Sequence, residues 1–284
     1  MEHCLTRALK VAIAAAKAGG EVLKRGRTRE LEIKEKDESR TSIVTSVDLQ
    51  SQQEIVNVIR KAFPGHAIVG EEGTTGDSQA ECIWFVDPLD GTTNYSHGLP
   101  FYCVSVALCD QHGICAGVIY DPYREDLFLA SRGGGAKLNG RGVVVSSTRS
   151  LRTSILATQV QSDNPIMLDR YASRSRRFVA SARAHRAIGS PALSLAYVAA
   201  GWLDAYCEPD MSPWDTLAGT LLVREAGGRV TTFVGEELPV RKPASILASN
   251  GLLHADLLQL LKSDDVTAST TASIESHLER SIHG

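Results

Sequence analysis

The chain has 284 residues, of which 43% are hydrophobic and 22% charged, as in ordinary globular proteins with one large domain or two packed lobes. Its net charge of −3 provides no long-range field that would attract nucleic acid or an anionic membrane surface, so we expect neither as a partner. No apolar run reaches the roughly 20 residues that cross a bilayer.

Residues 3–25 predict an amphipathic helix and not a signal peptide, because Lys10 and Lys17 interrupt their apolar stretch. The polar segment 34–42 predicts a mobile loop, and the β-branched run 43–47 a short strand. A second helix is expected at 48–63 and stops at a Pro-Gly pair. Strands follow at 67–69, 82–86, 102–109, 114–120 and 126–130.

The second half continues the mixed pattern, beginning with a hairpin turn at Asn139-Gly140. Strands are expected near residue 155 and at 203–206, 230–233 and 246–248, and helices at 190–201, 215–226 and 252–261. Helices that alternate with antiparallel-looking strands predict a layered α/β or α+β fold. Six cysteines without a C-x-x-C pair are expected to be reduced thiols, which favours a cytoplasmic protein.

Acidic residues stand where predicted strands end, at Glu71-Glu72 and at Asp87 and Asp90; a third acidic position, Asp215, starts a helix. Buried carboxylates require protons, cations or a metal, and Mg²⁺ prefers oxygen ligands. Asp87 and Asp90 flank a proline turn that follows an apolar strand, which favours a functional site over a solvated acidic turn. The next residues, Gly91-Thr92-Thr93, could open a helix whose amides bind phosphate.

Four separated motifs carry a family resemblance. They are W-F-V-D-P-L-D-G-T-T-N-Y at 84–95, W-D-x-x-A-G-x-x-L-x-x-E-A-G-G at 214–228, G-S-x-A-L-x-L-A-Y-V-A-A-G-x-L-D-A-Y at 189–206, and G-E-E at 70–72 with T-x-x-D at 45–48. Their order and spacing are similar to those of the inositol monophosphatase family over roughly residues 5–262. Members of that family are Mg²⁺-dependent, Li⁺-sensitive phosphomonoesterases.

The resemblance implies the αβαβα fold that the family shares with fructose-1,6-bisphosphatase. It implies a single domain at 1–262 with two packed lobes, about 1–145 and 146–262, and a homodimer. The Ser/Thr-rich segment 263–284 is expected to be a flexible tail.

The resemblance also implies two Mg²⁺ ions and a third, weaker one. Glu71, Asp87 and the carbonyl of Leu89 would hold the first ion, and Asp87, Asp90 and Asp215 the second. A metal-activated water would attack the phosphate in line. Two departures bear on this site: Ser42 replaces a family aspartate on the loop that carries Lys36, and Pro191 replaces an alanine.

The remaining site residues follow from the same motif match. Thr92 would orient the water, with Asp48 hydrogen-bonded to it and Glu71 alongside. Two of these residues have plainer interpretations: Asp48 could be a helix N-cap, and Glu208 could be a surface carboxylate. The substrate contacts implied by the resemblance are Asp90, Gly91, Thr92, Gly189, Ser190, Pro191, Glu208 and Asp215.

The sequence therefore predicts hydrolysis of a phosphate monoester on a small polyol, with myo-inositol 1-phosphate as the first candidate. Relatives of the same fold act on fructose 1,6-bisphosphate, histidinol phosphate, NADP or 3'-phosphoadenosine 5'-phosphate, and these substrates remain alternatives. A non-catalytic regulatory protein is disfavoured, because every metal-ligand position of the motifs is filled.

Overall fold

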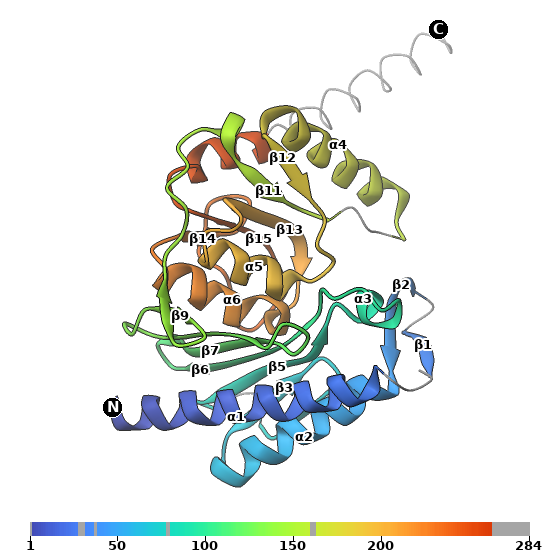
Figure 1. The fold of residues 1–284 in the computed structure, drawn as a ribbon, viewed down its shortest axis with the longest axis vertical. Helices are drawn as coiled ribbons and strands as arrows, with labels where there is room; N and C mark the ends of the chain where they lie inside the picture. The colour runs from blue at the N-terminus through green and yellow to red at the C-terminus, as the bar shows by residue number, and fades with distance from the viewer. Residues whose placement is uncertain (1, 28–31, 37–38, 78–79, 160–162, 263–284) are drawn as a thin grey trace, which may run out of the picture.

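The computed structural model describes residues 2–27, 32–36, 39–77, 80–159 and 163–262. Helix pairs and sheets alternate in five layers, α–β–α–β–α, from α1 and α2 at one end to α4 at the other (Figure 1). The layered fold expected from the sequence is confirmed. Segment 263–284, which was expected to be a flexible tail, lies outside the described residues.

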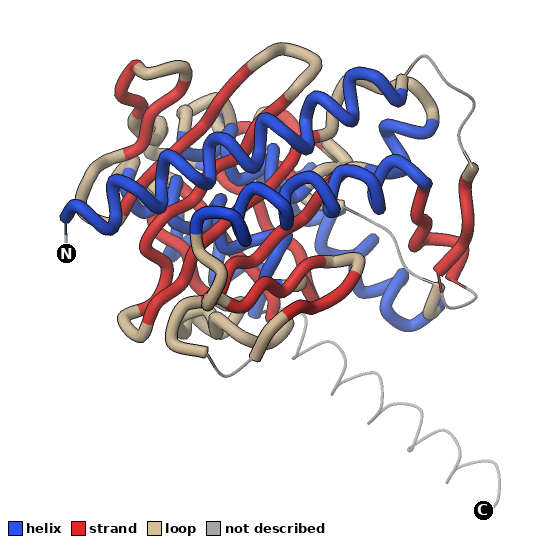
Figure 2. The backbone as a smooth tube through the Cα atoms, turned by 90° about the horizontal axis from the view of Figure 1, so that it is seen from below, coloured by secondary structure: helices blue, strands red, loops and turns tan. Residues whose placement is uncertain are grey.

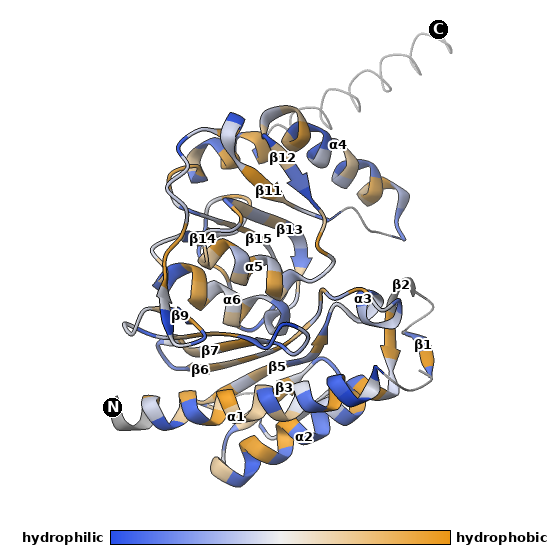
Figure 3. Ribbon diagram, in the orientation of Figure 1, coloured by the Kyte–Doolittle hydropathy of each residue, from blue (hydrophilic) through white to orange (hydrophobic). Residues whose placement is uncertain are grey.

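The first layer consists of α1 (Glu2–Gly26) and α2 (Ser46–Ala62), which run side by side across one face of the larger sheet (Figure 2). Both helices alternate between hydrophilic and hydrophobic patches (Figure 3). Their apolar side chains form a core with that face of the sheet, in which Trp84, Ile55 and Ile59 are fully buried. Both helices were predicted, although α2 begins two residues earlier than expected.

The second layer is an eight-stranded sheet in the order β10-β9-β8-β7-β6-β5-β3-β4. The predicted hairpin at Asn139-Gly140 is confirmed, since it joins β9 and β10. The pair β3 and β5 is parallel and the other neighbours are antiparallel. The strands are β3 (Ala67–Gly70), β4 (Gly73–Thr75), β5 (Ile83–Asp90), β6 (Cys103–Asp110), β7 (Gly113–Asp121), β8 (Asp126–Ser131), β9 (Ala136–Leu138) and β10 (Arg141–Val143).

The third layer, α5 (Pro191–Ala199) and α6 (Pro213–Glu225), is buried between the two sheets. Close approach requires small residues on α6. A Cβ atom at Gly219 would lie 2.4 Å from Cβ of Leu195 on α5, and one at Gly117 on β7 would lie 2.9 Å from the Ala218 carbonyl oxygen. The A-G pair of the 214–228 motif therefore lets α6 pack against both neighbours.

The fourth layer is a five-stranded sheet in the order β12-β11-β13-β15-β14. Its strands are β11 (Ile155–Ala157), β12 (Ala184–Arg186), β13 (Ala205–Met211), β14 (Arg229–Thr231) and β15 (Ala244–Ser249), with a short 3-10 helix, η1 (Leu151–Thr153), before β11. The fifth layer is α4 (Pro165–Ser181) and a helix at residues 254–262, whose apolar side chains, among them Phe178 and Leu257, cover the outer face of this sheet.

Two local predictions were wrong. The segment 34–42, predicted as a loop, contributes to the antiparallel strands β1 (Ile33–Lys36) and β2 (Ser39–Thr45), because pairing satisfies backbone groups irrespective of the polar side chains. Helix α4 was not predicted, since its sequence is mostly polar and only Arg174 and Phe178 of its residues are buried. Asn164, whose Oδ1 accepts from the Ile166 amide at 2.9 Å, was an available start signal.

The cysteine prediction is confirmed for the five described cysteines, which form no disulfide bond and of which four are buried. No helix within the described residues is both long enough and apolar enough to cross a membrane.

Candidate active site

A β-bulge in β5 brings Asp87 and Asp90 to the same face of the sheet. Asp87 pairs with Ser105 on β6 and Asp90 pairs with Cys103, so three residues of β5 span two residues of β6. In a regular strand, residues three apart point to opposite faces. The extra residue, within the Pro88-Leu89 step, reverses that alternation and places both carboxylates on one side.

Glu71 reaches this site because β3 and β5 are parallel and their carboxyl ends meet at one edge. It follows β3 directly, and its amide donates to the Val86 carbonyl at 3.1 Å, next to Asp87. The carboxylates that follow β3 and end β5 therefore lie at the same edge of the sheet. Glu72 lies beside it, with its amide donating to Oε1 of Gln52 at 3.0 Å.

Asp215 enters from the middle layer, in the first turn of α6. Its Oδ2 accepts a hydrogen bond from the Ser212 amide at 3.0 Å. The Ser105 hydroxyl donates to the Trp214 carbonyl at 3.0 Å and so ties the start of α6 to the strand residue opposite Asp87. The carboxylates on β5 and on α6 therefore face a common space.

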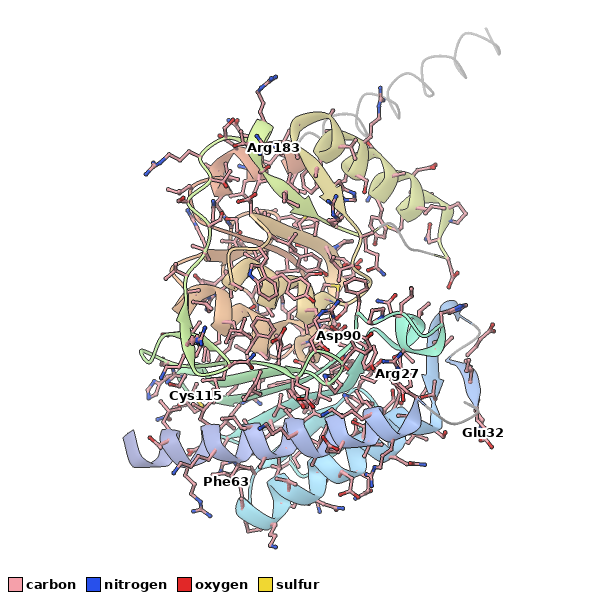
Figure 4. All side chains as sticks on the ribbon, in the orientation of Figure 1. Arg27, Glu32, Phe63, Asp90, Cys115 and Arg183 are labelled. Carbon is pink, nitrogen blue, oxygen red and sulfur yellow. The ribbon has the colours of Figure 1, made fainter. Side chains whose placement is uncertain are left out.

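That space is a cavity of about 290 Å³. It contains nine of the twelve residues assigned to the site from the sequence; Asp48, Ser190 and Glu208 lie behind the lining. In Figure 4, Asp90 lies where β5 meets the middle helix layer. The lining is Ile43, Glu71, Asp87, Leu89, Asp90, Gly91, Thr92, Thr93, Asn94, Gln159, Gly189, Pro191 and Asp215.

Burial and mutual repulsion make the charged forms of these aspartates costly. Burial raises the pKa of Asp90 to about 7. Burial, together with the charges of Glu71 and Asp90, raises the pKa of both Asp87 and Asp215 well above its ordinary value. Such a cluster is stable as carboxylates only if positive charge compensates it.

Each aspartate uses one oxygen inside the protein. Oδ1 of Asp87 accepts from the Leu89 amide at 3.0 Å, Oδ2 of Asp90 accepts from the Ala192 amide at 2.8 Å, and Oδ2 of Asp215 is bonded as described above. The second oxygen of each takes no hydrogen bond from any described residue. Three unengaged carboxylate oxygens around one cavity suit a hard divalent cation.

Among the described residues, no three His, Cys, Asp or Glu side chains already converge as a ready ligand set. The donor chemistry still fits Mg²⁺, because all candidate ligands are oxygens.

Thr92 and Asp48 form a hydrogen-bonded pair beside the carboxylates. The Thr92 hydroxyl lies 3.1 Å from Oδ1 of Asp48 and 3.0 Å from the Leu89 carbonyl oxygen. Asp48 is in the first turn of α2, where its Oδ2 accepts from the Thr45 amide at 2.9 Å. It is therefore part of a capping box with Thr45, and Thr45, not Asp48, is the N-cap residue. Burial raises the pKa of Asp48 to about 6.

Gly91 begins the short helix α3 (Thr92–Ser96) with φ of 93°, a conformation that favours glycine. A Cβ atom there would lie 2.7 Å from the Phe101 carbonyl oxygen. The predicted helix start after Asp90 is confirmed, and the amides of Gly91 and Thr92 belong to its first turn.

The turn at residues 188–192 closes the cavity from the middle layer. Nδ2 of Asn94 donates to the Phe101 carbonyl at 2.8 Å and lies 2.9 Å and 3.2 Å from the carbonyl oxygens of Ile188 and Gly189. Ser190 caps α5 and donates its hydroxyl to Oδ2 of Asp90. Pro191, a departure from the family pattern, is the first residue of α5, where a missing amide hydrogen is not costly.

Glu208 lies on β13 behind the cavity. The Tyr206 hydroxyl donates to its Oε2, and burial raises the pKa of Glu208 to about 7. The negative charge of Asp90 raises that pKa further, whereas Arg174 of α4 lowers it.

The profile of the inositol monophosphatase family matches residues 5–265. This chain belongs to that family. The resemblance inferred from the four motifs is thereby confirmed over nearly the whole chain.

Curated relatives of this inositol monophosphatase family member carry different names. The Nus factor SuhB of Pseudomonas aeruginosa is 42% identical over 261 residues, which cover 89% of this chain and 95% of the relative. A protein of Aquifex aeolicus named fructose-1,6-bisphosphatase/inositol-1-monophosphatase is 38% identical over 260 residues, with 91% and 96% coverage.

Solved structures share the fold throughout. The IMPase of Thermotoga maritima superposes with a TM-score of 0.84 at 32% identity and covers 92% of this chain and 98% of its own. An IMPase/NADP phosphatase complexed with Mg²⁺ and phosphate gives 0.80 at 25% identity, with 90% and 95% coverage. The expected family fold is therefore confirmed.

Several site residues of this family member were missed by sequence reasoning. Asn94 lines the cavity and stands inside the 84–95 motif, so its proximity to Asp90 was an available signal; Thr93, which also lines the cavity, was named only as part of a possible phosphate-binding helix start. Ile43 and Gln159 also line it but had no such signal, because β2 and β11 reach the site only through the fold. The side chains of Lys36 and Ser42 lie outside the described residues.

Proposed function

We propose that this protein is a Mg²⁺-dependent phosphatase that hydrolyses the phosphate monoester of a small polyol, with myo-inositol 1-phosphate as its first substrate. The observation that carries the proposal is the set of Asp87 and Asp90, which are buried, and Asp215, which is partly buried, each with one unengaged oxygen at a common cavity. Membership of the inositol monophosphatase family supports the phosphatase class.

Two Mg²⁺ ions would be held by oxygen ligands alone. Glu71, Asp87 and the Leu89 carbonyl would contribute to one ion, and Asp87, Asp90 and Asp215 to the other. Bound ions of this kind neutralise the phosphate and make a water molecule more acidic. The structure of a relative complexed with Mg²⁺ and phosphate supports this choice of metal.

The chain's own contribution to proton movement would come from Thr92 and Asp48. A threonine hydroxyl has one proton and can donate it to one acceptor at full strength. When the Leu89 carbonyl serves as a ligand, Asp48 is the remaining acceptor at 3.1 Å. The Thr92 oxygen then presents its lone pairs to the cavity and would orient the attacking water through the proton that it accepts.

Gly91 and Thr92 would bind phosphate through backbone amides. They open α3 next to Asp90, and amides in a first helical turn lack intrahelical partners. Gly189 and Pro191, which line the cavity, would contact the alcohol part of the substrate. Glu208 is given the same role by the family resemblance alone, since it does not line the cavity.

The cavity of about 290 Å³ suits a small phosphorylated polyol. Fructose 1,6-bisphosphate is the principal alternative, because a relative bears that activity in its name. Phosphate release should be measured on inositol 1-phosphate, fructose 1,6-bisphosphate, histidinol phosphate, NADP and 3'-phosphoadenosine 5'-phosphate, each with millimolar Mg²⁺ and with EDTA. Release from none of them in Mg²⁺ would overturn the proposal.

A non-catalytic regulatory role is the alternative of a different class, because another relative is named a Nus factor. A protein that had lost turnover would be free to lose a metal ligand or the water-positioning pair. Glu71, Asp87, Asp90, Asp215 and the Thr92–Asp48 hydrogen bond are all present, which favours catalysis. Li⁺ inhibition of the measured activity would further support the family mechanism.

A further inference from the structure

Oδ2 of Asp90 is held by three donors that lie outside its own strand. The Ser190 hydroxyl and the Ala192 amide donate to it, the latter at 2.8 Å, and the Cys103 thiol donates at 3.5 Å. Ser190 is 1% exposed and Cys103 is fully buried, and neither lines the cavity. All three donors therefore point at the carboxylate from the protein side.

The donors come from two different layers. Cys103 is the cross-strand partner of Asp90 on β6, whereas Ser190 and Ala192 form the N-terminal end of α5 in the middle layer. A rotation of the Asp90 side chain would break all three hydrogen bonds at once. The bonds thus fix one oxygen and leave Oδ1 directed toward the cavity that Asp87 and Asp215 share.

We propose that Ser190, assisted by Cys103, is a positioning residue that sets the orientation of Asp90 toward the cation, and that Ser190 does not contact the substrate. The sequence assigned Ser190 to substrate binding. In the structure, the buried Ser190 hydroxyl instead donates a hydrogen bond to Asp90. Its oxygen lies 3.4 Å from the Leu193 amide in the α5 cap. This inference rests on the cation site of the proposed function.

The geometry makes a substitution at Ser190 specific. The turn that carries it is held independently by Nδ2 of Asn94, at the carbonyl oxygens of Ile188 and Gly189. Removal of the Ser190 hydroxyl therefore leaves these anchors of the turn in place. It removes one donor from Asp90, which keeps its Ala192 and Cys103 donors, and it removes the long cap contact with the Leu193 amide at 3.4 Å.

The test compares Ser190→Ala, Ser190→Thr and Ser194→Ala by calorimetric titration of the metal-free protein with Mg²⁺ and by steady-state kinetics. Ser190→Ala should weaken Mg²⁺ binding about tenfold, as loss of a residue that orients a ligand does. At saturating Mg²⁺, the KM for substrate should stay within about twofold. Ser190→Thr should restore Mg²⁺ binding because it keeps the hydroxyl.

Ser194→Ala is the matched control. Ser194 is a buried serine of the same helix whose hydroxyl donates to the Ser190 carbonyl at 2.8 Å and does not contact Asp90. It should bind Mg²⁺ like the wild type.

Cys103 gives a second test that does not alter the turn. Cys103→Ala should weaken Mg²⁺ binding less than Ser190→Ala, and Cys103→Ser should retain it. Cys109→Ala, at a buried thiol on the same strand, should have no effect. This pair keeps the inference testable if Ser190→Ala does not fold.

The outcomes separate the inference from the function on which it rests. Wild-type Mg²⁺ affinity combined with a raised KM in Ser190→Ala would make Ser190 a substrate contact and overturn the inference alone. Absence of Mg²⁺ binding by the wild-type protein would overturn the cation site itself.

Discussion

Individual residues of this site use one polar atom for a hydrogen bond within the protein and leave another for the proposed chemistry. Asp87, Asp90 and Asp215 each give one oxygen to a donor in the protein and keep the other at the cavity. The Thr92 hydroxyl likewise donates its proton to an acceptor in the protein and keeps its oxygen lone pairs for the cavity. Orientation is therefore built from short-range hydrogen bonds, whereas the unfavourable charge is left for a ligand to compensate.

Asp90→Asn tests the charge at this position. The amide has nearly the same shape, but it removes one negative charge from the proposed cation site. Turnover should fall by at least about 10³-fold, comparable with the loss of a main electrostatic group in other enzymes. The kcat of the purified variant at saturating Mg²⁺ is the measurement, with circular dichroism as the folding control. A near-normal kcat would refute the role of Asp90.

Thr92→Ala tests the water-positioning pair. Loss of the hydroxyl should lower kcat about 10²-fold, while Mg²⁺ affinity changes little because Thr92 supplies no carboxylate. Thr92→Ser keeps the hydroxyl and should retain most of the activity. Parallel loss of kcat and Mg²⁺ binding in Thr92→Ala would show that the residue only maintains the local structure.

His254, which lies outside the site, should make the free energy of unfolding depend on pH. Its ring is fully buried between the hydroxyls of Thr231 and Ser249, at 2.9 Å and 2.8 Å. Burial lowers its pKa to about 4. Between pH 4 and the ordinary value of 6.5 the unfolded chain binds more protons than the folded chain, so stability falls as pH falls through this window.

The loss attributable to His254 is at most about 3 kcal/mol. Urea unfolding of the wild type and of His254→Gln at pH 7 and pH 4.5 isolates this contribution, because the other titrating groups are common to both proteins. The wild type should lose more stability than the variant over this interval. Equal losses would contradict the assignment.

At the scale of elements, the site depends on a bulge, a parallel strand pair and three helix starts. The bulge in β5 aligns Asp87 with Asp90, the β3–β5 pair brings Glu71, and the first turns of α2, α5 and α6 hold Asp48, Ser190 and Asp215. Helix starts suit carboxylates, because their unsatisfied amides stabilise negative charge. The close packing of α6 is what places Asp215.

Gly219→Ala tests this packing. Alanine normally favours a helix by about 1 kcal/mol over glycine, but the new Cβ would lie 2.4 Å from Cβ of Leu195. The clash should dominate and lower the free energy of unfolding by about 1–3 kcal/mol. Gly65→Ala, which meets no atom within 4 Å, is the control in the same denaturant titration. A variant at Gly219 as stable as wild type would show that α6 can shift freely.

At the scale of the whole molecule, the cavity lies between the eight-stranded sheet and the middle helix layer, so it exists only when both are assembled. We therefore propose that the two lobes expected from the sequence unfold together. The homodimer stays a prediction, which light scattering of the purified protein would decide.

The sequence alone determined the family, the layered fold and most of the proposed ligands, because the motif at 84–95 is contiguous and a local chain segment keeps its order in any fold. Strand and helix patterns were also readable where apolar residues form one face of a helix, as in α1, or a continuous run, as in β6. Helix α4, strand β1 and the first half of β2 were missed, since these segments are mostly polar.

Only the tertiary structure decided how these parts combine. Asn94 and Gln159 join the cavity, Cys103 faces Asp90, and the Ser190 hydroxyl turns to that carboxylate and away from the cavity. These relations join residues up to 100 positions apart in the chain. They arise from a bulge, a strand register and a helix start, which are set by the packing of layers and not by local sequence.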